Sequence, residues 1–415
     1  MGEMDLGENH TLFIPTFNRP DHLQRLIQYY RTQAPSMCLL VLDTSQPEIA
    51  QRNGTWLSSL GNAVSHKIYP QSMMLMRKLN EGLTLVKTPY VSFCADDDVI
   101  FPTGIRAAIS FLHHNRSYST AHGVYLNFRV SEHDVLLNSE YTGESITDEA
   151  AGARIFALCQ KYESLFYAVY RTADARKTFS FLVAISTTHY QELFQSAATL
   201  ILGKAKRLPV FYGARQSGPP AQADLDKWQT FHWFADNPSE VLDSYTTYRS
   251  LLWDYYQMHG AKPQLVQQQF LTALDLAHAV YFSAGCSPEY FFSRLQPLWP
   301  SEQYLRRGRL DTLPEARKLL YVKRHFWPGR QQANDILDQM RLSSRLGAWS
   351  RDGLVGGLRF LFQTAMGCVV LLGMRARFAI AARQILQCHL PGHLVWMAGR
   401  KSFRDAYKEL CVYLR

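Results

Sequence analysis

The chain has 415 residues, of which 47% are hydrophobic and 19% charged, the composition of a globular protein with two or three packed units. These values exclude a disordered chain. The formal net charge of +9 lies in residues 340–415, which carry 12 Lys and Arg against 3 Asp and Glu, and the remainder is neutral. We therefore expect this segment to meet an anionic surface.

Residues 1–130 are expected to alternate strands with helices. The expected strands are His10–Ile14, which ends at Pro15, Cys38–Leu42, His66–Tyr69, Tyr90–Phe93 and Gly123–Val130. The expected helices are one that begins at Pro20, with Leu23, Leu26, Ile27 and Tyr30 on an apolar face, and one over Met73–Val86. This alternation predicts an α/β fold with a mostly parallel sheet and helices on both faces.

The pattern from residue 149 to residue 212 is mixed, and the chain beyond it is helical. We expect a strand, a helix and a strand over Phe166–Arg171, His189–Gly203 and Arg207–Tyr212, then a loop over Gln216–Ala223 and helices over Ser239–Tyr256 and Leu265–Phe282. The chain is therefore divided into a catalytic α/β unit over residues 1–220, a helical domain over 221–339 and a basic, apolar-rich segment over 340–415.

Three adjacent carboxylates, Asp96, Asp97 and Asp98, follow the expected strand Tyr90–Phe93. Their charges repel one another unless a cation or a set of hydrogen-bond donors compensates them. Hard oxygen ligands at the carboxyl end of a strand suit Mg²⁺ or Mn²⁺ that holds a phosphate. The alternative is an acidic turn that caps a helix beginning near Thr103.

Other polar groups are expected at the same edge of the sheet. The first strand is followed by Pro15-Thr16-Phe17-Asn18-Arg19 and the second by Asp43-Thr44-Ser45, and the helix before the acidic run carries Arg77, Lys78 and Asn80. Because the carboxyl ends of parallel strands share one edge, these groups are expected to converge on one nucleotide.

In these motifs the chain resembles the family-2-type inverting glycosyltransferases of bacteria, over residues 9–220. The matching residues are Ile14-Pro15-Thr16-Phe17-Asn18-Arg19, Leu42-Asp43-Thr44-Ser45, Lys78-Leu79-Asn80-Glu81-Gly82 and the run from Tyr90 to Asp98. The chain departs from the family pattern at Thr44, where Asp or Gly is common. The resemblance implies a GT-A fold, which is Rossmann-like, and a nucleotide-diphosphate sugar donor, a UDP-sugar first of all, bound with Mn²⁺ or Mg²⁺.

The resemblance also implies roles for individual residues. Donor-binding residues would be Pro15, Thr16, Arg19, Asp43, Lys78, Asn80, Asp96, Asp97 and Arg215, and Asp96 and Asp98 would form the DxD pair on the metal. Each has a structural alternative: Pro15 ends a strand, Asp43 caps a loop, Asn80 bonds the backbone of its helix, Arg77 or Lys78 faces solvent, and Arg215 lies on the surface. Asp97 either faces the sugar or holds the loop.

Inverting glycosyl transfer needs a carboxylate that takes the proton of the acceptor hydroxyl. The resemblance places this base after the DxD strand, at the start of a helix, where Glu192 stands. Thr187 or Thr188 is expected to cap this helix, with Glu192 in its first turn, a position that the helix dipole also favours for purely structural reasons. His189, Glu163 and Asp174 are alternative candidates for the base.

The C-terminal segment contains an apolar run. Gly353–Met374 carries one charge, Arg359, in 22 residues and is followed by Arg375, Arg377 and Arg383 among apolar side chains. This pattern is typical of an interfacial helix on anionic lipid, and it also fits an inserted segment or a packed helical domain or interface. The basic residues are not interleaved with stacking aromatics in a polar stretch, so nucleic acid is not an expected partner.

Two features predict the cellular compartment. The seven cysteines are scattered without a CxxC pair, which argues against a zinc site and a disulfide framework. Met1–Asp5 is acidic and lacks the features of a signal peptide. We therefore expect a cytoplasmic protein, with the segment 340–415 as a peripheral contact to the inner face of the cell membrane.

The sequence is interpreted as a metal-dependent, inverting glycosyltransferase that acts on a glycan or lipid-linked acceptor in surface polysaccharide or glycoconjugate synthesis. One alternative is a nucleotidyltransferase, which would also use Asp-held metal but is expected to have a glycine-rich phosphate loop, and Pro15–Arg19 contains no glycine. The other is a non-catalytic binding protein on a transferase fold, against which the intact acidic run argues.

Overall fold

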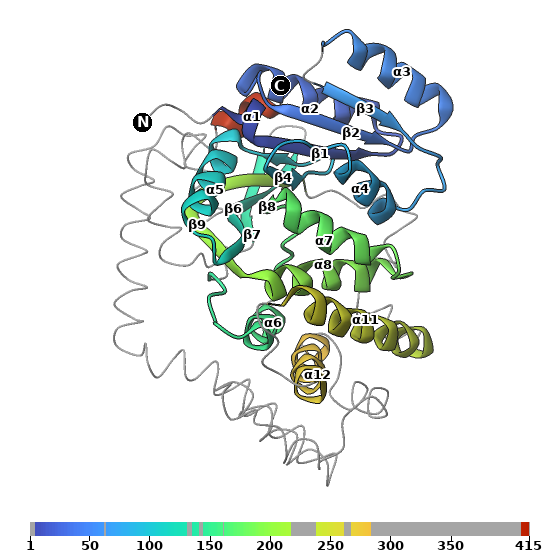
Figure 1. Ribbon diagram of the computed structural model, residues 1–415. Helices are drawn as coiled ribbons and strands as arrows, with labels where there is room; N and C mark the ends of the chain where they lie inside the picture. The colour runs from blue at the N-terminus through green and yellow to red at the C-terminus, as the bar shows by residue number, and fades with distance from the viewer. Residues whose placement is uncertain are drawn as a thin grey trace.

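The structure is a computed structural model of the chain and describes residues 5–61, 64–130, 135–140, 144–160, 162–216, 238–260, 267–283 and 408–414 (Figure 1). Over these residues a central sheet is covered by helices on both faces. The α/β fold class that the sequence predicts is confirmed, and the arrangement is consistent with a GT-A fold.

The strands are β1 (His10–Thr16), β2 (Cys38–Asp43), β3 (Val64–Ile68), β4 (Tyr90–Phe93), β5 (Val99–Ile100), β6 (Tyr118–Val130), β7 (Val135–Glu140), β8 (Val169–Arg171) and β9 (Lys204–Gln216). Their order in the sheet is β3-β2-β1-β4-β8-β6-β9-β5, with β7 beside β6. β3, β2, β1 and β4 are parallel, and β8 runs antiparallel to both β4 and β6. The ends of β1, β2 and β4 therefore meet at one edge.

The helices are α1 (Leu6–Asn9), α2 (Pro20–Gln33), α3 (Pro47–Ser58), α4 (Leu75–Leu83), α5 (Pro102–His114), α6 (Ala151–Gln160), α7 (Thr172–Leu182), α8 (Thr188–Leu202), α11 (Pro238–His259) and α12 (Gln267–Ser283). Successive side chains of β1 point to opposite faces of the sheet, and each face has its own core. Leu12 and Ile14 pack under α2 and α5, whereas Phe13 packs under α4, α7 and α8. α11 and α12 extend this second face beyond α8 and α6 (Figure 1).

Some boundaries differ from those expected. β1 continues through Pro15 to Thr16. Proline has no N–H to donate, but β4 pairs with β1 only up to Phe13, so no hydrogen bond between β1 and β4 is lost at Pro15. The strand expected over Phe166–Arg171 is limited to Val169–Arg171. Phe166 instead stacks on Phe93 in the core, with ring centroids 5.3 Å apart.

The remaining expectations for the second half of the chain are only partly covered. Gly353–Met374 and most of the loop Gln216–Ala223 lie outside the described residues, and the domain boundaries stay predictions. No helix within the described ranges is long and apolar enough to cross a membrane. Residues 408–414 form a helical turn that lies against α2 (Figure 1).

Candidate active site

The loops that follow β1 and β2 hold each other at the edge of the sheet. Asn18 has a left-handed φ of 54°, which asparagine tolerates because its side chain can bond locally. Its backbone N–H donates to Ser45 Oγ over 2.8 Å, and its Oδ1 accepts from the backbone N–H of Gln46 over 2.8 Å. Thr16 and Arg19, on either side of Asn18, reach the loop after β4.

Asp96 and Asp97 are bound by this first loop. Thr16 Oγ1 donates to Asp96 Oδ2 over 2.7 Å, and Arg19 Nη1 lies 3.3 Å from Asp96 Oδ1 and 2.7 Å from Asp97 Oδ2. Burial raises the pKa of Asp96 to about 6, although the Thr16 hydrogen bond and the Arg19 charge act in the opposite direction. The raised pKa means that the surrounding donors do not fully balance the negative charge of the Asp96 carboxylate. A bound cation would supply the missing positive charge.

Asp98 is buried among a different set of donors. The Tyr167 hydroxyl donates to Asp98 Oδ2 over 2.7 Å, the Gln216 backbone N–H donates to Oδ1 over 2.8 Å, and Arg215 Nε lies 3.7 Å from Oδ2. The Arg215 guanidinium also lies over the Tyr167 ring, 5.3 Å from its centroid. Burial raises the pKa of Asp98 to about 6 against the charge of Arg215.

The short strand β5 brings Arg215 and Gln216 to this carboxylate. β5 begins directly after Asp98 and pairs antiparallel with the part of β9 that includes Gly213. A Cβ at Gly213 would lie 2.6 Å from the backbone oxygen of Val99, so the close approach of the two strands requires glycine. The end of β9 is thereby held beside the acidic loop.

Asp43 lies beneath the loop after β2 with no exposed surface. The Ser45 backbone N–H donates to Oδ1 over 2.8 Å, and Asn53 Nδ2 and His66 Nε2 contact Oδ2 at 2.9 and 3.2 Å. Burial alone would raise the pKa of Asp43, but the hydrogen bonds outweigh it and hold that pKa well below its usual range. The carboxylate thus supports the loop from beneath, and the nucleoside contact that the resemblance implies for Asp43 stays a prediction.

The Lys78 side chain extends from α4 to the ends of β1 and β2, beneath the loops that follow these strands. Its Nζ lies 3.3 Å from the backbone oxygens of Thr16 and Leu42 and donates to Thr44 Oγ1 over 2.9 Å. Burial lowers the pKa of Lys78 to about 8, with nearby carboxylates acting in the opposite direction. The side chain is a buried brace between β1 and β2, so the solvent-facing alternative does not hold for Lys78.

Glu192 lies on α8, half-buried and close to the end of β9. Burial raises the pKa of its carboxyl group, while a hydrogen bond from the Ser164 hydroxyl and the charge of Arg215 lower it by less. Arg215 also pairs with Asp98. One guanidinium group therefore interacts with both the candidate base and the last carboxylate of the acidic run.

The carboxylates of the acidic run could contribute ligands to a metal ion. The described part of the chain contains no group of three or more His, Cys, Asp or Glu side chains that could enclose an ion. Asp96 and Asp98 already accept protein hydrogen bonds, but each carboxylate oxygen keeps a second lone pair. Mg²⁺ in phosphate sites commonly takes one or two carboxylates and completes its shell with phosphate and water. The donor set fits an ion that arrives with a diphosphate.

No family model and no curated protein matches the sequence. Similar solved structures include S. aureus TarS 1–349, at a TM-score of 0.44 and 14% identity, and the same protein in complex with UDP-GlcNAc, at 0.46 and 15%. Its complex with UDP aligns at 0.41 and 14%. These alignments cover 82% of this chain and 92% of TarS 1–349.

Asn80 and Arg77, the other polar residues considered on helix α4, do not share the position of Lys78. Asn80 lies about 200° around the helix axis from Lys78, because each residue turns the helix by about 100°. It is half-buried, and no hydrogen bond joins it to the other candidate residues within the described chain. Arg77 is exposed and pairs with Glu81 at 3.6 Å, which is the solvent-facing position considered for it.

The helix-cap expectations are also corrected. α5 begins at Pro102 with Phe101 as its N-cap residue, so Asp96 to Asp98 do not cap it. Thr187 is the N-cap residue of α8, but its side chain makes no capping hydrogen bond. Glu192 is the fifth residue of α8 and lies beyond its first turn.

The alternative bases are Glu163, Asp174 and His189. Glu163 forms an ion pair with Arg207, and Asp174 pairs with Lys177 at 3.1 Å on α7. His189 is half-buried near the start of α8. The charge of Arg215 acts on Glu192, the remaining carboxylate considered for this role.

Sequence reasoning missed several residues around the site, namely Asn53, His66, Ser164, Tyr167 and Gln216. His66 had a usable signal, because β3 pairs parallel with β2 and brings His66 to the same edge as Asp43. Tyr167 and Gln216 had none, since their contacts with Asp98 depend on the pairing of β5 with β9 and on the position of the chain before β8.

Proposed function

We propose that this protein is a metal-dependent, inverting glycosyltransferase that takes its sugar from a nucleotide-diphosphate donor, with a UDP-sugar as the first candidate. The observation that carries the proposal is that Asp96 pairs with Arg19 and Asp98 lies 3.7 Å from Arg215 at the carboxyl edge of the parallel strands. The charge of Arg215 also acts on Glu192. Ligands of α/β sheets bind at this edge.

The arginines suit the diphosphate of such a donor. Arg19 is 43% exposed at the mouth of the site, and Arg215, whose side chain is 32% exposed, lies on the other side of the acidic loop. Guanidinium groups bind phosphate oxygens through paired donors. Asp96 and Asp98 would hold Mn²⁺ or Mg²⁺, which neutralises charge on a departing diphosphate.

Glu192 is proposed as the base. The acceptor hydroxyl oxygen forms a bond to the anomeric carbon while the bond from that carbon to the diphosphate oxygen breaks, and the hydroxyl proton passes to the Glu192 carboxylate. The raised pKa suits this role, since a general base is most effective when its pKa approaches the working pH. Ser164 holds the carboxylate in place through its hydrogen bond.

The acceptor is proposed to be a glycan or a lipid-linked saccharide of a surface polysaccharide or glycoconjugate pathway. The support is the charge of residues 340–415, because a segment with 12 Lys and Arg against 3 Asp and Glu is attracted to anionic lipid. On this proposal the protein works at the inner face of the cell membrane, where it meets a lipid-carried acceptor.

A thermal-shift panel tests the donor. The full chain is heated with UDP-, GDP-, CMP- and dTDP-sugars, with and without Mn²⁺. We expect a Mn²⁺-dependent rise in Tm with at least one diphosphate sugar and its loss in Asp98→Asn. Asp174→Asn, which changes a carboxylate on α7 paired with Lys177, is the matched control and should keep the shift. No rise with any donor would contradict the proposal.

A further inference from the structure

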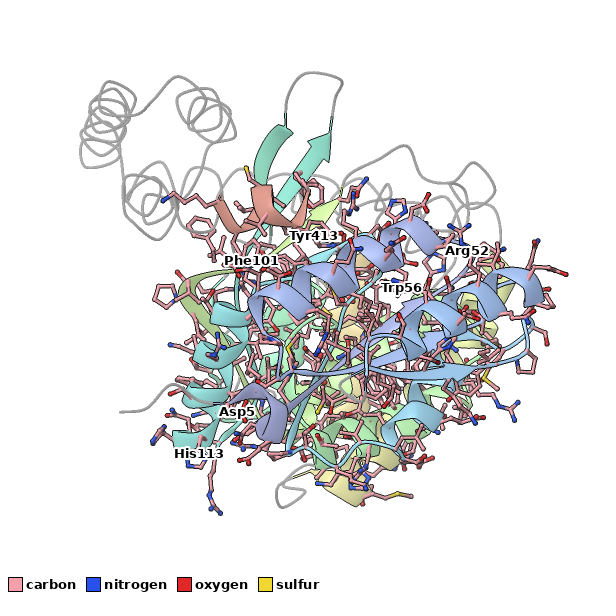
Figure 2. All side chains as sticks on the ribbon, turned by 90° about the horizontal axis from the view of Figure 1, so that it is seen from above. Asp5, Arg52, Trp56, Phe101, His113 and Tyr413 are labelled. Carbon is pink, nitrogen blue, oxygen red and sulfur yellow. The ribbon has the colours of Figure 1, made fainter. Side chains whose placement is uncertain are left out.

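The last residues of the chain pack against the first long helix. The C-terminal turn, residues 408–414, buries Leu410 and Tyr413 completely in the core between α2 and β6. The Tyr413 ring meets those of Tyr29 and Phe128 edge to face, at 5.7 and 6.2 Å between centroids. In Figure 2 the turn, with Tyr413 labelled, lies beside α2. Both side chains are removed from water, and this hydrophobic burial docks the turn on the protein.

One cation connects this turn to the candidate site. The Arg25 guanidinium, from α2, lies over the Tyr413 ring at 4.6 Å from its centroid, and Nη2 donates to the Tyr413 hydroxyl over 3.1 Å. The same Nη2 donates to Gln216 Oε1 over 2.9 Å. The Gln216 backbone N–H in turn donates to Asp98 Oδ1 over 2.8 Å. The chain of contacts therefore runs from the C-terminal turn to a buried carboxylate of the acidic run.

We propose that Tyr413 and Arg25 are positioning residues for Asp98, acting through the side chain of Gln216. Gln216 is the last residue of β9 in the described part of the chain, and it bonds Arg25 through its side chain and Asp98 through its backbone amide. The Arg25 hydrogen bond fixes the Gln216 side chain, and Tyr413 fixes Arg25 by accepting a second bond and presenting its ring face. The inference rests on the proposed function only in taking Asp98 to meet the metal and the diphosphate.

Two tyrosines at the same interface provide a matched test. Tyr413→Phe removes the hydroxyl that accepts from Arg25 and keeps the packed ring. Tyr29→Phe removes the hydroxyl that donates to Glu409 over 2.7 Å, a second hydrogen bond between the turn and α2, and leaves Arg25 untouched. A merely structural role of the turn predicts similar effects of both changes, whereas the positioning role predicts an effect of Tyr413→Phe alone.

Hydrogen exchange of the full chain without ligand tests the contacts from Tyr413 through Arg25 and Gln216 to Asp98 directly. We expect the Gln216 backbone amide to exchange about tenfold faster in Arg25→Met and about threefold faster in Tyr413→Phe. Each change removes a hydrogen bond that restrains Gln216 directly or through Arg25, so the bond from the Gln216 amide to Asp98 should open more often. It should be unchanged in Tyr29→Phe. Unchanged exchange in Arg25→Met, or equal acceleration in the two tyrosine variants, would overturn the inference.

Titration with UDP and Mn²⁺ reads the consequence. We expect the affinity to fall about tenfold in Arg25→Met and about threefold in Tyr413→Phe, to be largely restored in Arg25→Lys, whose ammonium can still donate to Gln216, and to be unchanged in Tyr29→Phe. Wild-type protein that binds no UDP would contradict the proposed function. The exchange experiment would still decide whether Tyr413 and Arg25 position Asp98. Wild-type binding that none of the variants weakens would overturn the inference alone.

Discussion

Arg19 Nη1 lies 2.7 Å from Asp97 Oδ2, closer than its 3.3 Å approach to Asp96 Oδ1. The Asp97 side chain is 28% exposed, whereas that of Asp96 is 4% exposed. The three adjacent carboxylates are therefore not equivalent. The middle one faces solvent and holds an arginine of the neighbouring loop, and the outer two are turned into the protein, where burial raises the pKa of each.

Asp97→Asn should have a small effect on stability and a measurable effect on donor binding. Exposed ion pairs contribute about 0 to 1 kcal/mol, so the free energy of unfolding in urea should fall by less than about 1 kcal/mol. Arg19 would keep only its longer contact with Asp96, and the affinity for UDP with Mn²⁺ should fall about threefold, within the range of one exposed interaction. A larger loss of stability would show that Asp97 has a structural role that its exposure does not indicate.

Asp98→Asn should stabilise the metal-free protein while it abolishes metal-dependent binding. The folded-state pKa of Asp98, about 6, lies above the unfolded value near 3.9, so the unfolded state holds fewer protons and stability falls as the pH rises from about 4 to about 6. Above that window the ionised carboxylate destabilises the fold. The neutral amide removes this effect, and at pH 7.5 with EDTA the variant should be more stable by roughly 1 to 3 kcal/mol.

The measurement is urea unfolding of Asp98→Asn and wild type at pH 4.5 and pH 7.5. The difference between the two proteins should grow with pH and be small at pH 4.5. Asp97→Asn, at the partly exposed middle carboxylate, is the control. A variant that is less stable than wild type at both values would mean that the hydrogen bonds from Tyr167 and Gln216 outweigh the charge burial.

Glu192→Gln should remove the chemistry and leave donor binding intact. The amide cannot take a proton, so turnover should fall at least about a hundredfold, the usual contribution of a general base. Affinity for the donor should stay within about twofold, as expected for a neighbour of the diphosphate site that makes no bond to it. Glu81→Gln, at an exposed carboxylate paired with Arg77, should keep full turnover. Turnover that survives in Glu192→Gln would exclude Glu192 as the base.

The pH profile of wild-type turnover gives a second reading of Glu192. A base works in its deprotonated form, so the rate should fall as the pH drops through its pKa. Burial raises that pKa, and the acid limb of the profile should therefore lie above the ordinary glutamate value of about 4.3. An acid limb at or below that value would assign the proton to another group.

Lys78→Met should remove a rise of stability with pH. The pKa of Lys78 is about 8 in the folded protein and about 10.5 unfolded, so between these values the unfolded state holds more protons and stability increases with pH. Relative to the variant, wild type should gain about 2 kcal/mol between pH 7.5 and pH 9.5. Lys177→Met, at a lysine that is 42% exposed, is the control and should show no such difference. A flat difference for Lys78→Met would mean that Lys78 stays charged throughout this range.

The sequence was sufficient for the parts of the site that depend on local pattern. β-prone runs followed by polar loops place Thr16, Asp43 and Asp96 at strand ends, and the parallel order of β2, β1 and β4 brings those ends together. The same reasoning could not tell which of two residues on α4 faces the sheet, because the helix was expected to be longer than Leu75–Leu83 and its phase was unknown. Lys78 faces the strands and Asn80 does not.

The remaining contacts depend on pairings between distant segments. Tyr167 and Gln216 reach Asp98 from chain positions far along the sequence, and Arg25 meets Tyr413 across 388 residues. No periodicity or motif marks such contacts, since each depends on how the far half of the sheet and the C-terminal turn return to the first half. The surroundings of Asp43 could not be predicted for a related reason: Asn53 and His66 enclose it, and burial of this carboxylate depends on three elements at once.

Gly213→Ala should damage the site from a distance. The added Cβ would lie 2.6 Å from the backbone oxygen of Val99, a contact that backbone atoms cannot relieve without separating β5 from β9. We expect a loss of about 1 to 3 kcal/mol in the free energy of unfolding, as for other overpacked positions, and a fall in affinity for UDP with Mn²⁺ because Arg215 and Gln216 move away from Asp98.

Gly152→Ala is the matched control for this change. A Cβ at Gly152, in α6, would lie 3.5 Å from the Ala273 Cβ, which is ordinary van der Waals contact, and alanine favours a helix over glycine by about 0.5 to 1 kcal/mol. This variant should be at least as stable as wild type and bind UDP equally well. If Gly213→Ala behaved in the same way, the pairing of β5 with β9 would not be what holds Arg215 and Gln216 beside Asp98.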